Sequence, residues 1–157
     1  MFCCNMMDQN VYFADSPEKK RVFYVRRFDE YMLPYYKQAL EMATENEDKA
    51  DYLYRIANIY VSMQNYQQGV SFANQALEYS PEDGRCYLLI GLCYASAKIY
   101  DDPILARSVY WVACDMFNKA KSVDSSCAAD ANKLIATYAQ YFPSKEDVFF
   151  HKELNDG

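Results

Sequence analysis

The side chains that could carry out catalysis are few in this sequence, and they lie apart from one another. His151 is the only histidine, so a histidine-dependent nucleophile or general base would have to be built around this one residue. Asp101 and Asp102 are adjacent, but neighbouring residues do not face each other as a catalytic carboxylate pair must, and Pro103 after them indicates a helix start that they cap. We therefore predict that the protein is not an enzyme, with a hydrolase on a helical scaffold as the least favoured alternative.

Metal and cofactor chemistry has no better support in the residue types and their spacing. The six cysteines stand at positions 3, 4, 86, 93, 114 and 127, without the paired C-x-x-C spacing of a metal site. Four of them fall within helical patterns, where cysteine behaves as a small apolar residue. The four glycines form no glycine-rich phosphate loop. The sequence therefore predicts neither a metal nor a cofactor.

Charge and hydropathy limit the kinds of partner. The net charge of −6 disfavours nucleic acid, because phosphate binding needs a clustered basic surface. The basic run Lys19-Lys20-Arg21 with Arg26-Arg27 has acids beside it and is typical of the solvated face of an amphipathic helix. No stretch approaches the about 18 apolar residues of a membrane span, and the first ten residues lack the features of a secretory signal. We expect no nucleic acid, no membrane span and, by default, a cytoplasmic location.

The elements that would position binding residues are helices. Within residues 50–83, apolar residues recur at the spacing of an amphipathic helix, first in one segment and then in a second. The polar stretch 63–66 between them suits a helix–helix turn, and Ala57 and Gly69 are small enough to let two antiparallel helices approach closely. The apolar positions are Leu53, Ile56, Ala57 and Tyr60 in the first segment and Val70, Ala73, Ala76 and Leu77 in the second.

This pattern recurs along the chain. An offset of thirty-four residues, and then of a further forty-four, carries the first apolar set onto two later sets. These are Tyr87, Ile90, Gly91 and Tyr94, followed by Ala131, Leu134, Ile135 and Tyr138. Self-similarity of this kind is typical of helical arrays. With 52% hydrophobic residues and no alternating strand pattern, the 157-residue chain is predicted to be all-α and, by its length, a single domain.

The repeated positions resemble those of a known family. Small, Tyr, small, Ala and Pro residues follow one another in residues 50–83, as they do in the tetratricopeptide repeat, a thirty-four-residue helix-turn-helix. The matching residues are Ala57, Tyr60, Gly69, Ala76 and Pro81, and then Gly91, Tyr94, Ala113, Phe117 and Ala120 with ten residues inserted. The departures are Leu53, where the family often has Trp, and Ala73, where it usually has Phe. The resemblance covers about residues 28–141 and implies antiparallel helix hairpins stacked as an α–α superhelix, a tetratricopeptide-like solenoid.

The repeat divides the chain into an irregular segment over residues 1–15 and a single helical domain over residues 16–157. The domain is expected to contain a partial repeat (16–49), a repeat (50–83), a repeat with the ten-residue insertion (84–127) and closing helices (128–157). Residues 44–47 and 80–83 are interpreted as capping boxes, and Pro34 leaves open whether residues 17–43 form one kinked helix or two. Residues 110–150 are also similar to the closing segment of some longer bacterial proteins of this kind, which would make the chain the terminal part of a larger array.

The resemblance also implies a binding surface. In this family the first helix of each repeat lines a concave groove, and recognition comes from the inner faces of these helices. The expected groove residues are therefore Asp51, Tyr54, Asn58 and Ser62, followed by Arg85, Leu88, Leu92 and Ser96. Asn58 matches the asparagine with which chaperone-binding members grip a peptide C-terminus, but Tyr54 and Leu89 replace the basic residues of that clamp. That specificity is not predicted.

We predict a non-catalytic scaffold that binds a protein or a peptide of unknown identity in this groove. The alternative is a structural role, as a cap or a self-associating segment of a larger repeat protein. Two features favour the alternative: the first repeat is incomplete, and the start of the chain is apolar and contains cysteine.

Overall fold

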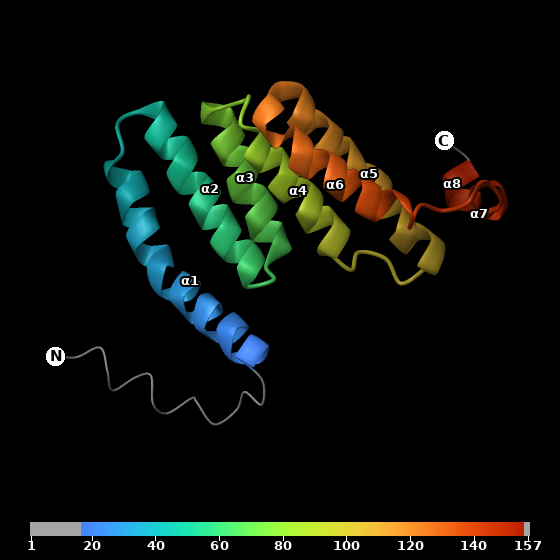
Figure 1. Cartoon of the computed structure of the whole chain (residues 1–157), viewed down its shortest axis with the longest axis horizontal. Helices are drawn as coiled ribbons and strands as arrows, with labels where there is room; N and C mark the ends of the chain where they lie inside the picture. Colours follow the sequence, from blue (N-terminus) through green and yellow to red (C-terminus); the bar gives the residue numbers. More distant parts are fainter. Residues whose placement is uncertain (1–16, 156–157) are drawn as a thin grey trace.

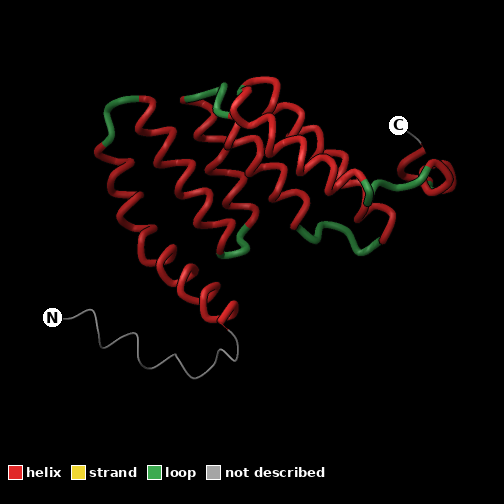
Figure 2. Tube along the Cα trace, in the orientation of Figure 1, coloured by secondary structure: helices red, strands yellow, loops and turns green. Residues whose placement is uncertain are grey.

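The computed structural model describes residues 17–155, with the backbone alone for residues 17–29, Glu153 and Asn155. Every regular element in this part of the chain is a helix (Figure 1; Figure 2). In chain order the elements are α1 (Pro17–Met42), α2 (Asn46–Ser62), α3 (Tyr66–Tyr79), α4 (Gly84–Ser96), α5 (Pro103–Val123), the 3-10 turn η2 (Ser125–Cys127), α6 (Ala128–Ala139), α7 (Lys145–Phe150) and α8 (Lys152–Asn155). The irregular segment expected over residues 1–15 lies outside the described residues.

The helices α1 to α6 form a row in which consecutive helices pack against each other, and α6 is drawn across α5 in this view (Figure 1). Within the row each helix packs against its immediate neighbours, and α2 also touches α4. The turns between them reverse the chain direction, while α7 and α8 pack together at the C-terminal end of the row (Figure 1). This row of neighbouring helices confirms the predicted all-α class, and its core is distributed along the row instead of gathered at one centre.

Small residues at the helix crossings make the close packing possible. Ala57 of α2 and Ala73 of α3 are fully buried and belong to one core cluster. At the equivalent positions of the next hairpin stand Gly91 of α4 and Phe117 of α5, where a Cβ atom added to Gly91 would lie 2.5 Å from Cε1 of Phe117. The larger ring on one helix is therefore accommodated by a smaller residue on the facing helix.

Helix starts are fixed by polar side chains, although not always by the ones that the sequence indicated. The carboxylate of Asp102 accepts hydrogen bonds from the backbone N–H groups of Ile104 and Leu105, and Ser144 and Asp147 form a reciprocal capping box at α7. The helix start predicted at Asp101-Asp102-Pro103 is therefore confirmed, with Asp102 as its cap.

The capping boxes predicted over residues 44–47 and 80–83 are wrong. The residue before α2 is Glu45, whose side chain makes no capping bond, and the hydroxyl of Thr44 donates to the Glu45 carboxylate at 3.5 Å. Helix α4 starts later than predicted, at Gly84, because Asp83 accepts from the backbone N–H of Arg85. A Cβ atom added to Gly84 would lie 2.7 Å from Cβ of Asp124, so a close approach of α4 to η2 also fixes this start.

The remaining differences concern the lengths of the helices. Residues 17–42 form one helix with Pro34 inside it, which settles the choice between one helix and two. The ten inserted residues are shared between the loop at residues 97–102 and α5, which has 21 residues where α3 has 14. Within the closing segment 128–157, the first helix, α6, ends at Ala139. Among the described helices, none combines the length and the apolar character that crossing a bilayer requires.

Candidate functional site

Two adjoining hollows lie along α2 and α4. One, of about 500 Å³, is lined by residues of α1, α2 and α4, and the other, of about 520 Å³, by residues of α2, α4, η2 and α6. Tyr54, Asn58 and Arg85 line both of them. The two hollows therefore adjoin at these three residues, and we refer to them together as the groove.

Seven of the eight residues expected in a groove line this one. Asp51, Tyr54, Asn58 and Ser62 are spaced by three or four residues on α2, which places them on one face of that helix. The same spacing brings Arg85, Leu88 and Leu92 of α4 to the groove. The exception is Ser96, the last residue of α4, which is exposed and lines neither hollow.

Further lining residues come from the first and last helices of the row and were not identified from the sequence. They are Met32 and Tyr36 of α1 and Asp130, Lys133 and Leu134 of α6. The repeat offsets between the first helices do not reach α1, so they could not indicate which of its residues face the groove. They also placed Leu134 at the position equivalent to Ile90, which is a core position. In the structure Leu134 is half-buried, because among the described helices α6 packs mainly against α5, whereas α4 packs against both α3 and α5.

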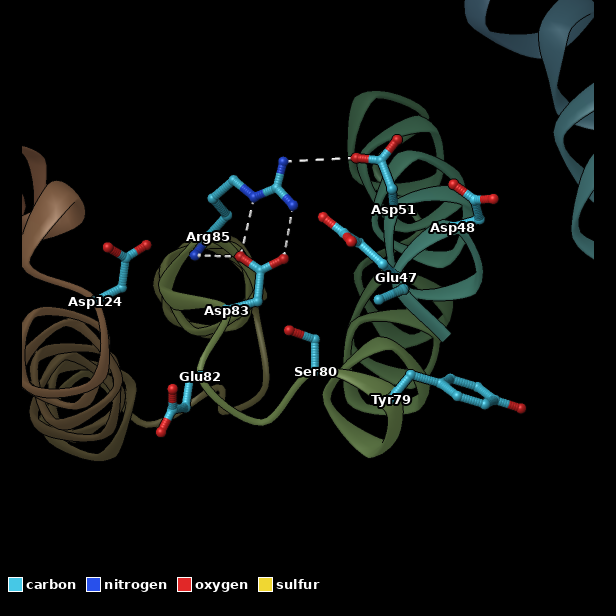
Figure 3. A pocket seen from close by; sticks show the side chains of 10 residues that line it. Glu47, Asp48, Asp51, Tyr79, Ser80, Glu82, Asp83, Arg85 and Asp124 are labelled. Carbon is cyan, nitrogen blue, oxygen red and sulfur yellow. Dashed lines mark hydrogen bonds and ion pairs between the residues drawn. The ribbon is translucent and has the colours of Figure 1, made fainter. Parts of the chain in front are cut away.

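Arg85 connects α2 and α4 at the centre of the groove. Its Nη2 lies 2.8 Å from Oδ2 of Asp83, and its Nη1 lies 3.6 Å from Oδ1 of Asp51 on α2 (Figure 3). The guanidinium carbon also lies over the ring of Tyr54, 4.6 Å from the ring centroid. The hydrogen bond to Asp83 raises the pKa of Arg85 and so favours its charged form.

A second arginine makes the same combination of contacts next to it. Nε of Arg55 lies 2.6 Å from Oδ2 of Asp51, and its guanidinium lies 5.8 Å from the ring centroid of Tyr36 on α1. The hydrogen bond to Asp51 raises the pKa of Arg55. One carboxylate therefore holds two arginines, and each arginine holds an aromatic ring that lines the groove.

Asn58 and Ser62, further along α2, differ in how many hydrogen-bonding groups remain free for a partner. The Ser62 hydroxyl donates to the Ile59 carbonyl oxygen at 2.8 Å, which uses its only proton. The Asn58 amide donates to the Tyr54 carbonyl oxygen at 3.1 Å. An amide carries a second donor and an acceptor, so Asn58 can still make two hydrogen bonds to another chain.

A third hollow, of about 740 Å³, adjoins the groove at Asp51 and Arg85 (Figure 3). It lies among the start of α2, the end of α3, the turn before α4 and Asp124, and it is rich in carboxylates. We refer to this part as the acidic mouth, formed by Glu47, Asp48, Asp51, Glu82, Asp83 and Asp124. Asp124 also starts η2, where it accepts from the backbone N–H of Ser126.

The residues that could have done chemistry lie elsewhere and have structural contacts. His151, after α7, places Nε2 3.4 Å from Oδ1 of Asp102, the residue that caps α5. A hydrogen bond from the Leu105 backbone lowers the pKa of Asp102, which suits a helix cap. Within the part of the chain that the structure describes, no group of His, Cys, Asp and Glu side chains could hold a metal ion. The side chains of the basic run at residues 19–27 lie outside the described part.

The fold and the groove together define an all-α protein built from a row of neighbouring helices with a groove along one set of them. Compared with protein-family models, curated proteins and solved structures, the chain matches none. Its function is therefore inferred from the groove.

Proposed function

We propose that the protein is a non-catalytic scaffold that binds a peptide, or an extended segment of another protein, in the groove. The observation that carries this proposal is that the two hollows adjoin at Tyr54, Asn58 and Arg85. This matters because an extended chain needs a surface that crosses several helices, and the two hollows together are lined by residues of α1, α2, α4 and α6.

The surface of the groove has the composition that peptide binding needs. Leu88, Leu92 and Leu134 are half-buried and form an apolar patch on which side chains of a partner can pack. Asn58 offers hydrogen bonds to a peptide backbone beside this patch. Tyr54 is held in place by Arg85 before any partner arrives, which lowers the entropy cost of binding.

The resemblance to tetratricopeptide repeats supports the same function. The hairpins α2–α3 and α4–α5 contain the small residues of that repeat at their crossings, and α2 and α4 would be its first helices. The groove lies along these two helices, where the family's recognition surface would be.

A random dodecapeptide display library tests this proposal. We expect selection against the full chain to enrich peptides that bind it saturably and that bind Tyr54→Ala/Asn58→Ala about tenfold or more weakly, because hot-spot truncations cost about 2 kcal/mol or more. The matched control is Gln67→Ala/Asn74→Ala, which removes two exposed side chains of α3 outside the groove and should keep full binding. Equal binding by both variants would reject the groove, and enrichment no better than on empty support would reject the proposal.

A structural role by self-association is the second candidate, favoured by apolar side chains exposed at both ends of the row. Met42 of α1 is 75% exposed, and Phe149 and Phe150 of α7 are 65% and 81% exposed. Repeat arrays expose such residues where they continue or need a cap. If this role is correct, light scattering at rising concentration will show a dimer that Met42→Lys or Phe150→Lys abolishes. A monomer at every concentration would reject it.

A further inference from the structure

We infer that the segment bound in the groove is basic, with Lys or Arg residues flanking apolar ones. This inference rests on the proposed function and specifies the chemistry of its partner. It is based on the charges around the groove and the acidic mouth, which are lined by seven carboxylates and only three basic side chains. The basic ones are Arg55, Arg85 and Lys133.

The two arginines are not available to a partner carboxylate, because the protein's own acids already bind them. Arg85 contacts Asp83 at 2.8 Å and Asp51 at 3.6 Å, and Arg55 contacts Asp51 at 2.6 Å. A carboxylate of an incoming peptide would have to displace one of these contacts. Only Lys133 remains as a basic group of the groove without an ion pair inside the described part of the chain.

Four of the seven acids are in the opposite situation. Glu47, Asp48, Glu82 and Asp130 are exposed, and the carboxylate of none of them makes a hydrogen bond or ion pair with another described residue. Glu47, Asp48 and Asp130 lie in the first turns of α2 and α6, where the positive end of the helix dipole stabilises acidic side chains. That explanation does not cover Glu82, which lies in the turn before α4.

The apolar patch lies among these charges. Asp130 lines the same hollow as Leu88, Leu92 and Leu134, and the acidic mouth joins the groove at Asp51. A segment whose apolar residues occupy the patch would therefore extend into surroundings of unpaired carboxylates. Carboxylates gathered in a hollow attract cations and repel anions, which favours a basic partner in both affinity and association rate.

The experiment compares charges on both molecules. For a peptide enriched from the dodecapeptide library, two analogues are made in which every Lys and Arg is replaced by Gln or by Glu, and binding to the full chain is followed by fluorescence anisotropy. The protein variant is Glu47→Gln/Glu82→Gln/Asp130→Asn. Its control, Glu41→Gln/Glu78→Gln/Glu146→Gln, makes the same change in net charge at exposed positions that line none of the three hollows.

We expect the enriched peptides to contain more Lys and Arg than the library as a whole, and the Glu analogue to bind worst. The groove variant should bind the parent peptide about tenfold more weakly than the control at low salt, and this difference should shrink at about 0.5 M salt. Enriched peptides that are neutral or acidic, yet still depend on Tyr54 and Asn58, would overturn the inference while leaving the proposed function standing. Equal weakening by the groove variant and its control would overturn it as well.

Discussion

The contact between Gly91 and Phe117 offers a quantitative test of how the helices cross. Substituting Gly91→Ala places a Cβ atom 2.5 Å from Cε1 and 2.8 Å from Cδ1 of Phe117, a ring that is fully buried and unable to swing into solvent. Overpacking of this kind costs about 1–3 kcal/mol. Replacing a glycine in a helix interior with alanine returns about 1 kcal/mol. We therefore expect a net loss of up to about 2 kcal/mol in the free energy of unfolding.

A double-mutant cycle combines Gly91→Ala with a second substitution that removes the Phe117 ring. Phe117→Ala leaves a cavity and should cost about 3–5 kcal/mol. In that background the methyl group of Gly91→Ala no longer meets the ring, and its nearest remaining neighbour is the Ala113 carbonyl oxygen at 3.0 Å. The double variant reproduces the Ala57 and Ala73 pair of the preceding hairpin, so we expect a favourable coupling of about 1–3 kcal/mol between the two sites.

Urea unfolding followed by far-ultraviolet circular dichroism measures all four proteins of this cycle. Ala136→Gly, at an exposed position of α6, serves as a reference for the helix propensity of glycine in this chain. If Gly91→Ala costs the same with and without the Phe117 ring, the two residues do not contact each other as described, and the account of the crossing is wrong.

Three further predictions concern other parts of the row. Arg107 donates hydrogen bonds to the carbonyl oxygens of Tyr141 and Phe142 and to the Asp147 carboxylate. Arg107→Ala should therefore release α7 at a cost of about 1 kcal/mol, which we expect to see as faster hydrogen exchange in α7 alone. Unchanged exchange would contradict this prediction. Hydrogen bonds from the backbone N–H groups of Leu105 and Ser144 lower the pKa values of Asp102 and Asp147. Both carboxylates therefore stabilise the fold at pH values above their unfolded pKa of about 4. This stabilisation is lost as the pH falls through the lowered pKa values of the folded state. The urea midpoint should therefore drop below about pH 4, and less so in Asp102→Asn/Asp147→Asn, because asparagine also caps helices; identical pH profiles would refute the assignment. Burial raises the pKa of Cys86 to about 12 and of Cys93 to about 11. Iodoacetamide at about pH 8 should therefore label both thiols only after unfolding. Labelled Cys86 or Cys93 in a mass map of the native protein would contradict this prediction.

The helical class and the crossings could be predicted from the sequence because they depend on local spacing and residue size. The three- and four-residue periodicity of Leu53, Ile56 and Ala57 appears in the structure as a buried face, and the offset of thirty-four residues carries Ala57 to the buried Gly91. The same periodicity places Tyr54 and Leu88 on the groove, since the face of a helix next to its buried stripe is set by geometry alone.

What could not be predicted depends on contacts between segments distant in the sequence. The start of α4 is set by the approach of Gly84 to Asp124, forty residues later, and no local pattern reveals that approach. Likewise, Asp130 and Lys133 enter the groove only because α6 packs on α5 in a register that the ten inserted residues obscure. Ser96 was predicted to line the groove and does not. Its spacing from Leu92 places it on the correct face of α4, but the groove ends before it.

The central claim is that the groove, and not another face of the row, binds the partner. Its most direct test is a nuclear magnetic resonance titration of the isotope-labelled chain with a peptide enriched from the display library. We predict that the amide signals that shift will be those of Tyr54, Asn58, Leu88 and Leu92, with their neighbours on α2, α4 and α6. Shifts confined to α3, to the outer side of α5 or to α7 would contradict the claim.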